Sequence, residues 1–509
     1  MFEIAELGVS MDKAEFEAKS RELQTCLQKV QQQLRNSRKS VIIIVSGVEG
    51  AGKGGVVNRL NEWFDARGVE TNAYWDITDE QKLRPRYWRF WRNLPARGRI
   101  GLMFGSWYTQ PIVEYAFQRS DEAEYKRRLQ EVTEFEQMLA ADGVILVKLW
   151  FHLKKSKVEK QLKADARSKH AVLQQSPWNR KYSKQFDRFL DVSQIAISMT
   201  DTGYAPWHII EAADVHYRDY TAGKTILDSI QPYVAEQPAQ PVAHHGKKPA
   251  KKPAQSAVVK TRAKAKAKTP KDFTVLDRVN LQKVIEPSEY SKKLVKWQTR
   301  LNELCWQARA QKRSLLLMFE GWDAAGKGSA IRRVTQSIDA RLYKVISIAA
   351  PTDEEAAHHY LWRFWRHIPL DGYVSIYDRS WYGRVLVERV EKFARDDEWQ
   401  RAYTEINHFE RQLTEHGIVL VKFWLHISPE EQYRRFKERE KTPWKYYKIT
   451  QEDWRNRDKW QDYKLAVNDM VEHTSTAAAP WNLIAANDKK FARIEILKTV
   501  CRMLEKQLG

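Results

Sequence analysis

The sequence predicts an α/β protein made of two copies of one domain, each with a mostly parallel sheet covered by helices on both faces. A chain of 509 residues is too long for one ordinary domain. The pentapeptide WRFWR begins at Trp88 and begins again at Trp362, 274 residues later. Short apolar runs alternate with segments of helical periodicity, which is the pattern of a parallel sheet with crossover helices.

The repeat extends over most of the chain at this one offset. GAGKG at 50–54 matches AAGKG at 324–328, SWY at 106–108 matches 380–382, and APW at 205–207 matches 479–481. A constant offset without insertions indicates a duplicated domain and not a solenoid of short repeats. We therefore expect one domain at residues 1–232, a connection at 233–271 and a second domain at 272–509.

Each copy begins with an amphipathic helix, because apolar residues recur at helical spacing from Phe16 to Leu34 and from Tyr290 to Ala308. A buried strand, a glycine loop and a helix starting near Gly55 or Ser329 follow. With its strands parallel, each sheet places its site at the C-terminal edge. The expected strands are 41–45, 100–104, 144–150 and 207–210 in the first copy, and 315–319, 345–348, 374–377, 418–424 and 481–484 in the second.

The connection is rich in Pro, Ala and Lys. Residues 247–271 contain ten Lys or Arg and no acidic residue, within a chain whose net charge is +21. Such a composition cannot build a core, so we expect a flexible, self-repelling linker. It is either a solvated spacer or an arm that binds a polyanion. A linker of this length also permits the two copies to dock as an intrachain pseudo-dimer, and homo-oligomers stay open.

Composition excludes several classes of protein. With 43% hydrophobic and 12% aromatic residues the chain is not disordered, and its basic surplus points to a polyanionic partner. The three cysteines, Cys26, Cys305 and Cys501, form no metal-ligand pattern and fit thiols in a reducing compartment. No signal pattern and no apolar run of membrane-spanning length occurs, so we expect a cytoplasmic protein without a membrane partner.

The segment GWDAAGKGS at 321–329 lies between an apolar strand and a helix. In that setting a GxxxxGK match is typical of a phosphate-binding loop. Its glycines let backbone N–H groups curl around phosphate oxygens, and its lysine reaches the transferring phosphates. The candidate phosphate-binding residues here are Gly321, Gly326, Lys327, Gly328 and Ser329.

The loop departs from the usual pattern directly after Lys327. Gly328 stands where the usual loop has a Ser or Thr hydroxyl that binds Mg²⁺. We expect two carboxylates to bind the metal instead, namely Asp323 in the loop and Asp378 at the end of the apolar strand YVSIY. Either can also orient or deprotonate the attacking phosphate oxygen. Ser329 is the alternative ligand.

Two further basic clusters are candidates for phosphate binding. In WRFWR, Trp362 and Trp365 share a helix face typical of a core, whereas Arg363 and Arg366 lie on a neighbouring face that suits phosphate oxygens. A second cluster follows His426 and favours a lid that closes over a polyanion, the alternative being a solvated face. Its basic residues are Arg434, Arg435, Lys437, Arg439, Lys441, Lys445 and Lys448.

The two copies differ where the chemistry is expected. At the positions of Asp323, Asp378 and Arg379 the first copy has Glu49, Phe104 and Gly105, and Gln110 and Asp165 replace Arg384 and Arg439. A phenylalanine removes charge where the metal would bind. The first copy keeps Lys53 and its glycines. We therefore expect catalysis in the second copy and a structural or polyanion-binding role for the first.

These motifs resemble those of the polyphosphate kinase 2 family. Its GxDxxGKG loop, WRFWR-type helix, DRSWYxR segment and later APW are matched at 321–328, 362–366, 378–384 and 479–481. The resemblance implies a P-loop kinase fold, a three-layer α/β/α sandwich with a helical lid. It also implies Mg²⁺-dependent transfer of a terminal phosphoryl group between inorganic polyphosphate and a nucleotide. The implied active-site residues are Asp323, Lys327, Asp378 and Arg379, with phosphate contacts from Arg384, Arg435, Arg439 and Lys445.

Within that family, chains with two fused domains resemble the class that phosphorylates AMP to ADP, and domain count is the reason for expecting AMP here. Single-domain members resemble kinases that use ADP or GDP, which is the first alternative. An ATP-using nucleotide kinase is a second. A non-catalytic protein that binds nucleic acid or another polyanion is a third, and its binding would weaken steeply with salt.

Overall fold

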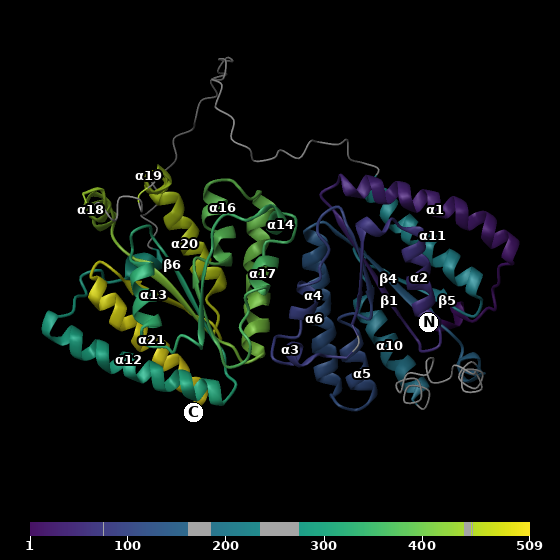
Figure 1. The fold of residues 1–509 in the computed structure, drawn as a ribbon, viewed down its shortest axis with the longest axis horizontal. Helices are drawn as coiled ribbons and strands as arrows, with labels where there is room; N and C mark the ends of the chain where they lie inside the picture. Colours follow the sequence, from purple (N-terminus) through teal and green to yellow (C-terminus); the bar gives the residue numbers. More distant parts are fainter. Residues whose placement is uncertain (75, 161–184, 235–273, 442–448, 450) are drawn as a thin grey trace, which may run out of the picture.

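The computed structural model describes residues 1–74, 76–160, 185–234, 274–441, 449 and 451–509. Two α/β units lie side by side, each with a five-stranded sheet (Figure 1). The strand orders are β2-β3-β1-β4-β5 and β7-β8-β6-β9-β10, and all neighbouring strands are parallel. The predicted duplicated α/β sandwich is therefore confirmed. The linker prediction lies almost entirely outside the described residues.

Four of the five strands of the first copy lie where the apolar runs predict them, and β1 is fully buried from Val41 to Ile44. The fifth, at 69–73, is not buried and lies outside the expected apolar runs. Helices α1, α2 and α11 cover one face of its sheet, and α4, α5, α6 and α10 cover the other. The strands are β1 (Ser40–Gly47), β2 (Val69–Ala73), β3 (Ile100–Phe104), β4 (Val144–His152) and β5 (Trp207–Glu211). The helices are α1 (Lys13–Arg35), α2 (Lys53–Trp63), α3 (Asp79–Lys82), α4 (Trp88–Trp91), α5 (Thr109–Ala116), α6 (Glu122–Ala141), α10 (Phe186–Thr200) and α11 (Val215–Val234).

The second copy repeats this arrangement, and α17 faces α6 of the first copy (Figure 1). Both helices that follow a glycine loop begin two residues before the predicted start, at the loop lysine. The strands are β6 (Leu315–Gly321), β7 (Tyr343–Ser347), β8 (Val374–Asp378), β9 (Val419–His426) and β10 (Trp481–Ala485). The helices are α12 (Pro287–Ala310), α13 (Lys327–Thr335), α14 (Asp353–Ala356), α15 (Trp362–Trp365), α16 (Val387–Val390), α17 (Asp396–Glu415), α18 (Pro429–Glu440), α19 (Gln451–Asp458), α20 (Trp460–Thr474) and α21 (Lys489–Leu508).

The two copies meet through equivalent residues. Trp91 and Trp365 are related by the repeat offset, and their rings stack with centroids 5.7 Å apart and planes 18° apart. The N–H of Arg97 donates to the carbonyl of Ala357 at 2.9 Å, and the equivalent bond runs from the N–H of Asp371 to the carbonyl of Leu83 at 3.2 Å. Reciprocal contacts of this kind define an isologous, pseudo-twofold interface. The two copies thus dock within one chain.

Motifs that the two copies share form a buried polar network in each. In the second copy the Lys422 ammonium lies 2.7 Å from Glu410 and 3.0 Å from the Tyr382 hydroxyl, and it donates to the carbonyl of Thr474. Trp381 also donates to Glu410, and Trp481 donates to the Thr474 hydroxyl. The first copy contains the same network around Lys148 and Glu136. SWY and APW therefore have a packing role in both copies.

Among the described residues, no helix combines the length and the apolar character that crossing a bilayer requires.

Candidate functional site

The glycine loop of the second copy curls at the C-terminal end of β6. Gly321 has a φ of +148°, and a Cβ there would lie 2.6 Å from the carbonyl oxygen of Leu425, so only glycine fits. Gly326 also has a positive φ, and so does Ala324, which is unusual for a residue with a Cβ. Lys327 Nζ donates to the carbonyl of Gly321 at 2.7 Å. Strand, loop and helix thus form the predicted phosphate-loop geometry.

Asp323 and Arg379 come together across the mouth of this loop. Asp323 Oδ1 lies 3.7 Å from Arg379 Nη2, and Asp323 Oδ2 accepts a hydrogen bond of 3.0 Å from Asn456 on α19. Asp378 ends β8, directly beside Phe319 of β6 in the parallel register. Arg379 has a φ of +65°, a strained conformation that turns the chain sharply after the strand. Asp323 therefore lies in the loop that follows β6, and Asp378 ends the neighbouring strand β8 at the same edge of the sheet.

A pocket of about 90 Å³ opens beside the loop. Asp323, Lys327 and Arg379 line it, together with residues that the sequence analysis missed. One wall is the segment 383–387, which begins within η4 (Trp381–Arg384). Residues of α19 and α20 form another. The missed lining residues are Glu320, Trp322, Gly383, Leu386, Val387, Trp424, Gln432, Glu452, Asn456 and Tyr463.

Glu320 is the most informative of these. Its carboxylate is buried and accepts a hydrogen bond of 2.8 Å from the Ser380 hydroxyl. Burial raises the pKa of Glu320, although the neighbouring Lys327 charge opposes this. The first copy has Ser46 at this position. A charged residue ending an otherwise apolar strand, directly before the loop, is the signal that could have identified it.

The arginines of WRFWR and Arg384 contact protein acceptors. Arg363 donates to the carbonyl of Ala349 at 3.0 Å, and Arg366 lies 3.1 Å from Glu354. Arg384 Nε lies 3.1 Å from Glu388, with its guanidinium over the ring of Tyr360. None of the three is among the residues that line the pocket described above. Trp362 and Trp365 are buried, as a core face requires.

Arg435 of α18 does not point to a phosphate site. Its guanidinium is buried and donates to the carbonyls of Ala324, Ala325, Ala486 and Asn487, and to Glu431. These protein acceptors occupy the donors that a phosphate would need, so the expected phosphate contact is replaced by a role in holding the loop. The sequence shows that this residue is charged but does not show where its side chain points.

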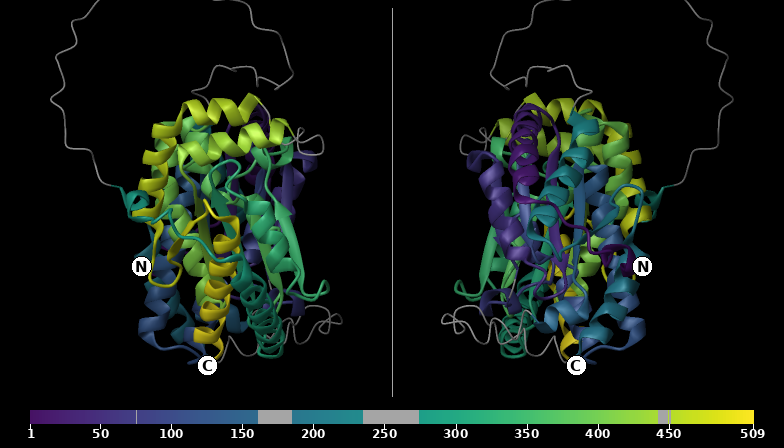
Figure 2. Two further views of the ribbon diagram at one scale, coloured as in Figure 1. Left: turned by 90° about the vertical axis from the view of Figure 1, so that its left-hand side faces the viewer. Right: turned by 90° about the vertical axis from the view of Figure 1, so that its right-hand side faces the viewer.

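The remaining loop and lid candidates take different positions. The Ser329 hydroxyl accepts a hydrogen bond of 3.2 Å from Arg493 Nη2, and a Cβ at Gly328 would meet open space. Arg439 lies on α18, and Lys445 falls outside the described residues. Helices α18 and α19 lie across the loop end of the sheet (Figure 2). The ring of Trp460, at the start of α20, stacks on Trp322 at 3.7 Å. This part of the chain covers the loop, as a lid would.

The equivalent loop in the first copy is filled by protein groups. Lys53 is buried and donates to the carbonyls of Gly47 and Val48 and to Glu49 at 3.3 Å. Arg218 Nη1 lies so close to Gly52 that a Cβ there would be only 1.8 Å away. Phe104 ends β3 where Asp378 ends β8. Gly105 stands at the position of Arg379, and its φ is +76°.

Among the described residues, no group of three or more His, Cys, Asp or Glu side chains forms a ready metal site. Proteins usually bind Mg²⁺ through one or two carboxylates together with substrate phosphates and water. Asp323 and Asp378 supply hard oxygen donors of that kind. The residues present therefore fit a magnesium ion brought together with phosphate.

Comparison with known proteins gives a consistent result over the whole chain. The family model for polyphosphate kinase 2 matches residues 10–238 and again residues 284–508. A polyphosphate:AMP phosphotransferase from Pseudomonas aeruginosa is 45% identical over 506 residues, covering 99% of each chain. One from Acinetobacter johnsonii is 38% identical and covers 92% of each. A GDP-polyphosphate phosphotransferase from Mycobacterium tuberculosis is 36% identical over 42% of this chain and 72% of its own length.

A crystal structure described as a polyphosphate kinase 2 from Pseudomonas aeruginosa superposes on the whole chain with a TM-score of 0.86 at 43% identity, and 99% of that chain is covered. The same family model thus matches both copies, and the relatives and the solved structure extend across the linker. This chain belongs to the polyphosphate kinase 2 family.

Proposed function

We propose that this protein transfers the terminal phosphoryl group of inorganic polyphosphate to AMP and so forms ADP. The observation that carries the proposal is the pocket of the second copy, where a phosphate loop, Asp323 and Arg379 converge. Relatives named polyphosphate:AMP phosphotransferase match nearly the whole chain. Relatives named for ADP or GDP match about two fifths of it, which favours AMP for a chain with two copies.

Mg²⁺ is part of this proposal, with Asp323 and Asp378 as its protein ligands. When bound, the ion neutralises charge on the phosphates and helps to align them. Lys327 lies at the N-terminus of α13, where its ammonium and the helix dipole both favour an anionic group. Arg379, 3.7 Å from Asp323, adds a second positive charge. These groups bind the donor phosphates and stabilise charge during transfer.

The reaction is an in-line displacement. An oxygen of the AMP phosphate attacks the terminal phosphorus of polyphosphate, and the P–O bond to the next phosphate of the chain breaks. The products are ADP and a polyphosphate shorter by one unit. The protein contributes positioning and electrostatic stabilisation, which supply most of the catalysis in phosphoryl transfer. The lid helices exclude water, which would otherwise hydrolyse the donor.

The first copy is catalytically degenerate in this proposal. Its loop lysine is engaged by Glu49, and Phe104 and Gly105 stand in place of the second carboxylate and the arginine. Residues 1–232 then serve as a scaffold for the catalytic residues 272–509, joined by the linker at 233–271. A cytoplasmic location, where AMP and polyphosphate would be available, completes the proposal.

The deciding experiment supplies the protein with Mg²⁺, long-chain polyphosphate and, in separate reactions, AMP, ADP or GDP, and identifies the nucleotide products. We expect ADP from AMP as the dominant product. Formation of ATP or GTP at a higher rate than ADP would support the diphosphate-kinase alternative. No product from any acceptor, combined with salt-sensitive binding of nucleic acid, would support the non-catalytic alternative.

A further inference from the structure

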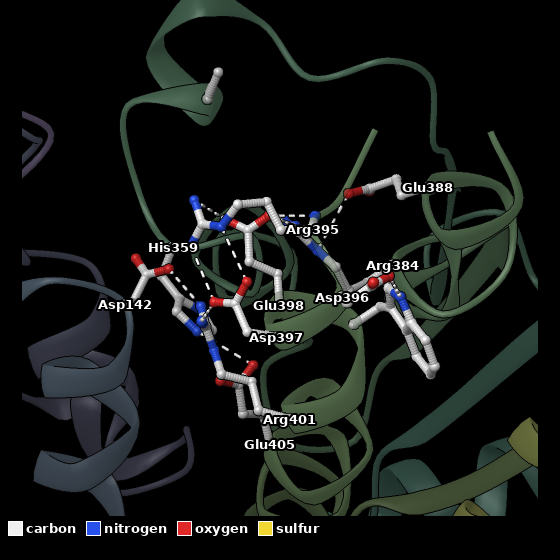
Figure 3. Close-up of polar contacts among 12 residues, drawn as sticks. Asp142, His359, Arg384, Glu388, Arg395, Asp396, Asp397, Glu398, Arg401 and Glu405 are labelled. Atoms are coloured by element: carbon white, nitrogen blue, oxygen red, sulfur yellow. Dashed lines mark hydrogen bonds and ion pairs between the residues drawn. The ribbon is translucent and has the colours of Figure 1, made fainter. Parts of the chain in front are cut away.

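Among the charged pairs at the interface between the two copies, one continues into a network of the catalytic copy. Asp142 follows α6 of the first copy and is largely buried. Its carboxylate accepts a hydrogen bond of 2.9 Å from Arg401 Nη2 on α17 of the second copy (Figure 3). It accepts another of 3.0 Å from Arg97 Nη2 of its own copy. Asp142 is therefore a direct ionic link from the degenerate copy to helix α17.

Arg401 extends this link within the second copy. Its Nε donates to Glu405 at 2.8 Å, and Glu405 in turn faces His359 Nε2 at 3.4 Å. The N–H of Leu361 donates to His359 Nδ1, so the neutral ring carries its proton on Nε2, toward Glu405. Arg401 Nη1 also lies 3.7 Å from Asp397. The Arg401 guanidinium thus contacts Asp142 of the first copy and two carboxylates on neighbouring turns of α17. Through Glu405 it is also connected to the segment before α15.

The N-terminal part of α17 is also connected to a wall of the catalytic pocket. Glu398, three residues before Arg401, lies 3.9 Å from Arg384 Nη1, and Arg384 packs over the ring of Tyr360 at 4.5 Å. Arg384 also pairs with Glu388 of α16 (Figure 3). It therefore connects α17 to the segment 383–387, whose residues Gly383, Leu386 and Val387 line the pocket.

This link is closer on one side of the pseudo-twofold axis than on the other. The positions equivalent to Asp142 and Arg401 are His416 and Arg127. His416 pairs with Asp371 of its own copy at 2.9 Å. Arg127 pairs with Glu131 of its own copy at 2.6 Å and lies 3.8 Å from Glu415 of the other copy. The closer pair, at 2.9 Å, therefore ties Asp142 to α17 of the copy that carries the second carboxylate and Arg379.

We infer that Asp142 of the degenerate copy is a positioning residue for the catalytic pocket, acting through Arg401, the start of α17 and Arg384 on the wall at 383–387. The inference rests on the proposed function for its kinetic consequence and on the geometry alone for its structural one. It gives the first copy a defined contribution to catalysis, which is to hold the wall at 383–387 of the catalytic pocket in place.

The test compares Asp142→Asn with a matched control, Glu134→Gln. Glu134 also lies on α6, and it pairs with Arg411 of α17, ten residues beyond Arg401 and away from the pocket wall. We expect Asp142→Asn to lower kcat/KM for AMP at least about fivefold, whereas Glu134→Gln changes it less than about twofold. Equal kinetic effects of the two variants would overturn the inference.

A double variant identifies the route. If Asp142 acts through Arg401, Asp142→Asn has little further effect on kcat/KM in an Arg401→Gln background, because residues in one network are not additive. Additive effects would show that Asp142 acts instead through Arg97, and would overturn the proposed route.

Amide hydrogen exchange separates failure of this inference from failure of the proposed function, because it needs no substrate. In the full-length protein, Asp142→Asn is expected to increase exchange in peptides covering 381–390, and Glu134→Gln is not. Unchanged exchange in that segment overturns the inference even if AMP is phosphorylated. Increased exchange supports it even if another nucleotide proves to be the acceptor.

Discussion

The Lys422 ammonium and the Glu410 carboxylate lie 2.7 Å apart in the core of the second copy, and both side chains are almost fully buried. Lys148 and Glu136 reproduce the pair at 2.8 Å in the first copy. Burial lowers the pKa of Lys422, and the Glu410 charge opposes this shift without cancelling it. The ion pair persists at this depth because the Tyr382 hydroxyl and the Thr474 carbonyl also accept from the ammonium.

Replacing Lys422 by Met leaves the Glu410 charge buried without its partner. We expect the free energy of unfolding to fall by about 3–5 kcal/mol, the usual effect of breaking a buried ion pair. Urea denaturation monitored by tryptophan fluorescence measures it. Lys148→Met is the matched control in the first copy and should cost a similar amount. A loss below about 1 kcal/mol in either variant would contradict a structural role for the pair.

Asp378→Ala should abolish turnover, whereas Lys53→Ala should leave much of it. In the proposed mechanism Asp378 is a metal ligand beside the transferring phosphate, so its removal is expected to lower kcat by about 10²- to 10³-fold or more. Lys53 is paired with Glu49, and its loop has no catalytic part in the proposed mechanism. Initial rates of ADP formation give the comparison. Equal losses from both substitutions would assign catalysis to both copies.

His426 makes the stability of the second copy depend on pH. Its Nδ1 accepts from Trp322 Nε1 at 3.0 Å, and burial lowers the pKa of His426 to about 4. The unfolded chain binds this proton near pH 6.5 and the folded chain does not, so stability falls as the pH falls from about 6.5 to about 4. A shift of this size corresponds to about 3 kcal/mol.

The His426→Gln variant removes that titration. Its free energy of unfolding, measured by urea denaturation at pH 7, 6, 5 and 4.5, should therefore change less with pH than that of the unsubstituted protein. Identical slopes for the two proteins would show that His426 is not held in its neutral form.

Arg435→Lys should impair the phosphate loop although the charge is kept. A lysine cannot reproduce the fork that binds four backbone carbonyls at once, two of them in the loop. We expect kcat/KM for polyphosphate to fall about tenfold, together with a lower thermal midpoint. Arg300→Lys, in an exposed ion pair on α12, serves as the control and should change neither quantity. Full activity of Arg435→Lys would argue against the positioning role.

Sequence reasoning identified the fold because periodicity and a constant repeat offset are properties of the chain itself. It also located Asp323, Lys327 and Arg379, since a strand, a glycine loop and a neighbouring strand end must meet at one sheet edge. It did not identify Glu320, because its position is that of an ordinary residue near the end of a strand. It assigned Arg435 to phosphate binding because the sequence gives the charge of a residue but not the orientation of its side chain.

The interface between the two copies could not be predicted from the sequence, for a related reason. Trp91 and Trp365 have the pattern of core residues, and a buried aromatic looks the same whether its neighbour belongs to its own domain or to another. The ionic link from Asp142 to Arg401 joins residues 259 positions apart. No local pattern indicates such a pairing. A three-dimensional arrangement was needed to show that Asp142 of the first copy contacts helix α17 of the second.

The stacked pair Trp91 and Trp365 has an evolutionary consequence. In a homodimer, one codon would encode both partners of a symmetric contact, so any substitution would appear twice. Here two codons encode them, and each side of the interface can change alone. Covalent linkage also makes the pairing independent of protein concentration. In the proposed function, the duplication allowed one copy to lose its catalytic residues while it continued to pack against the other.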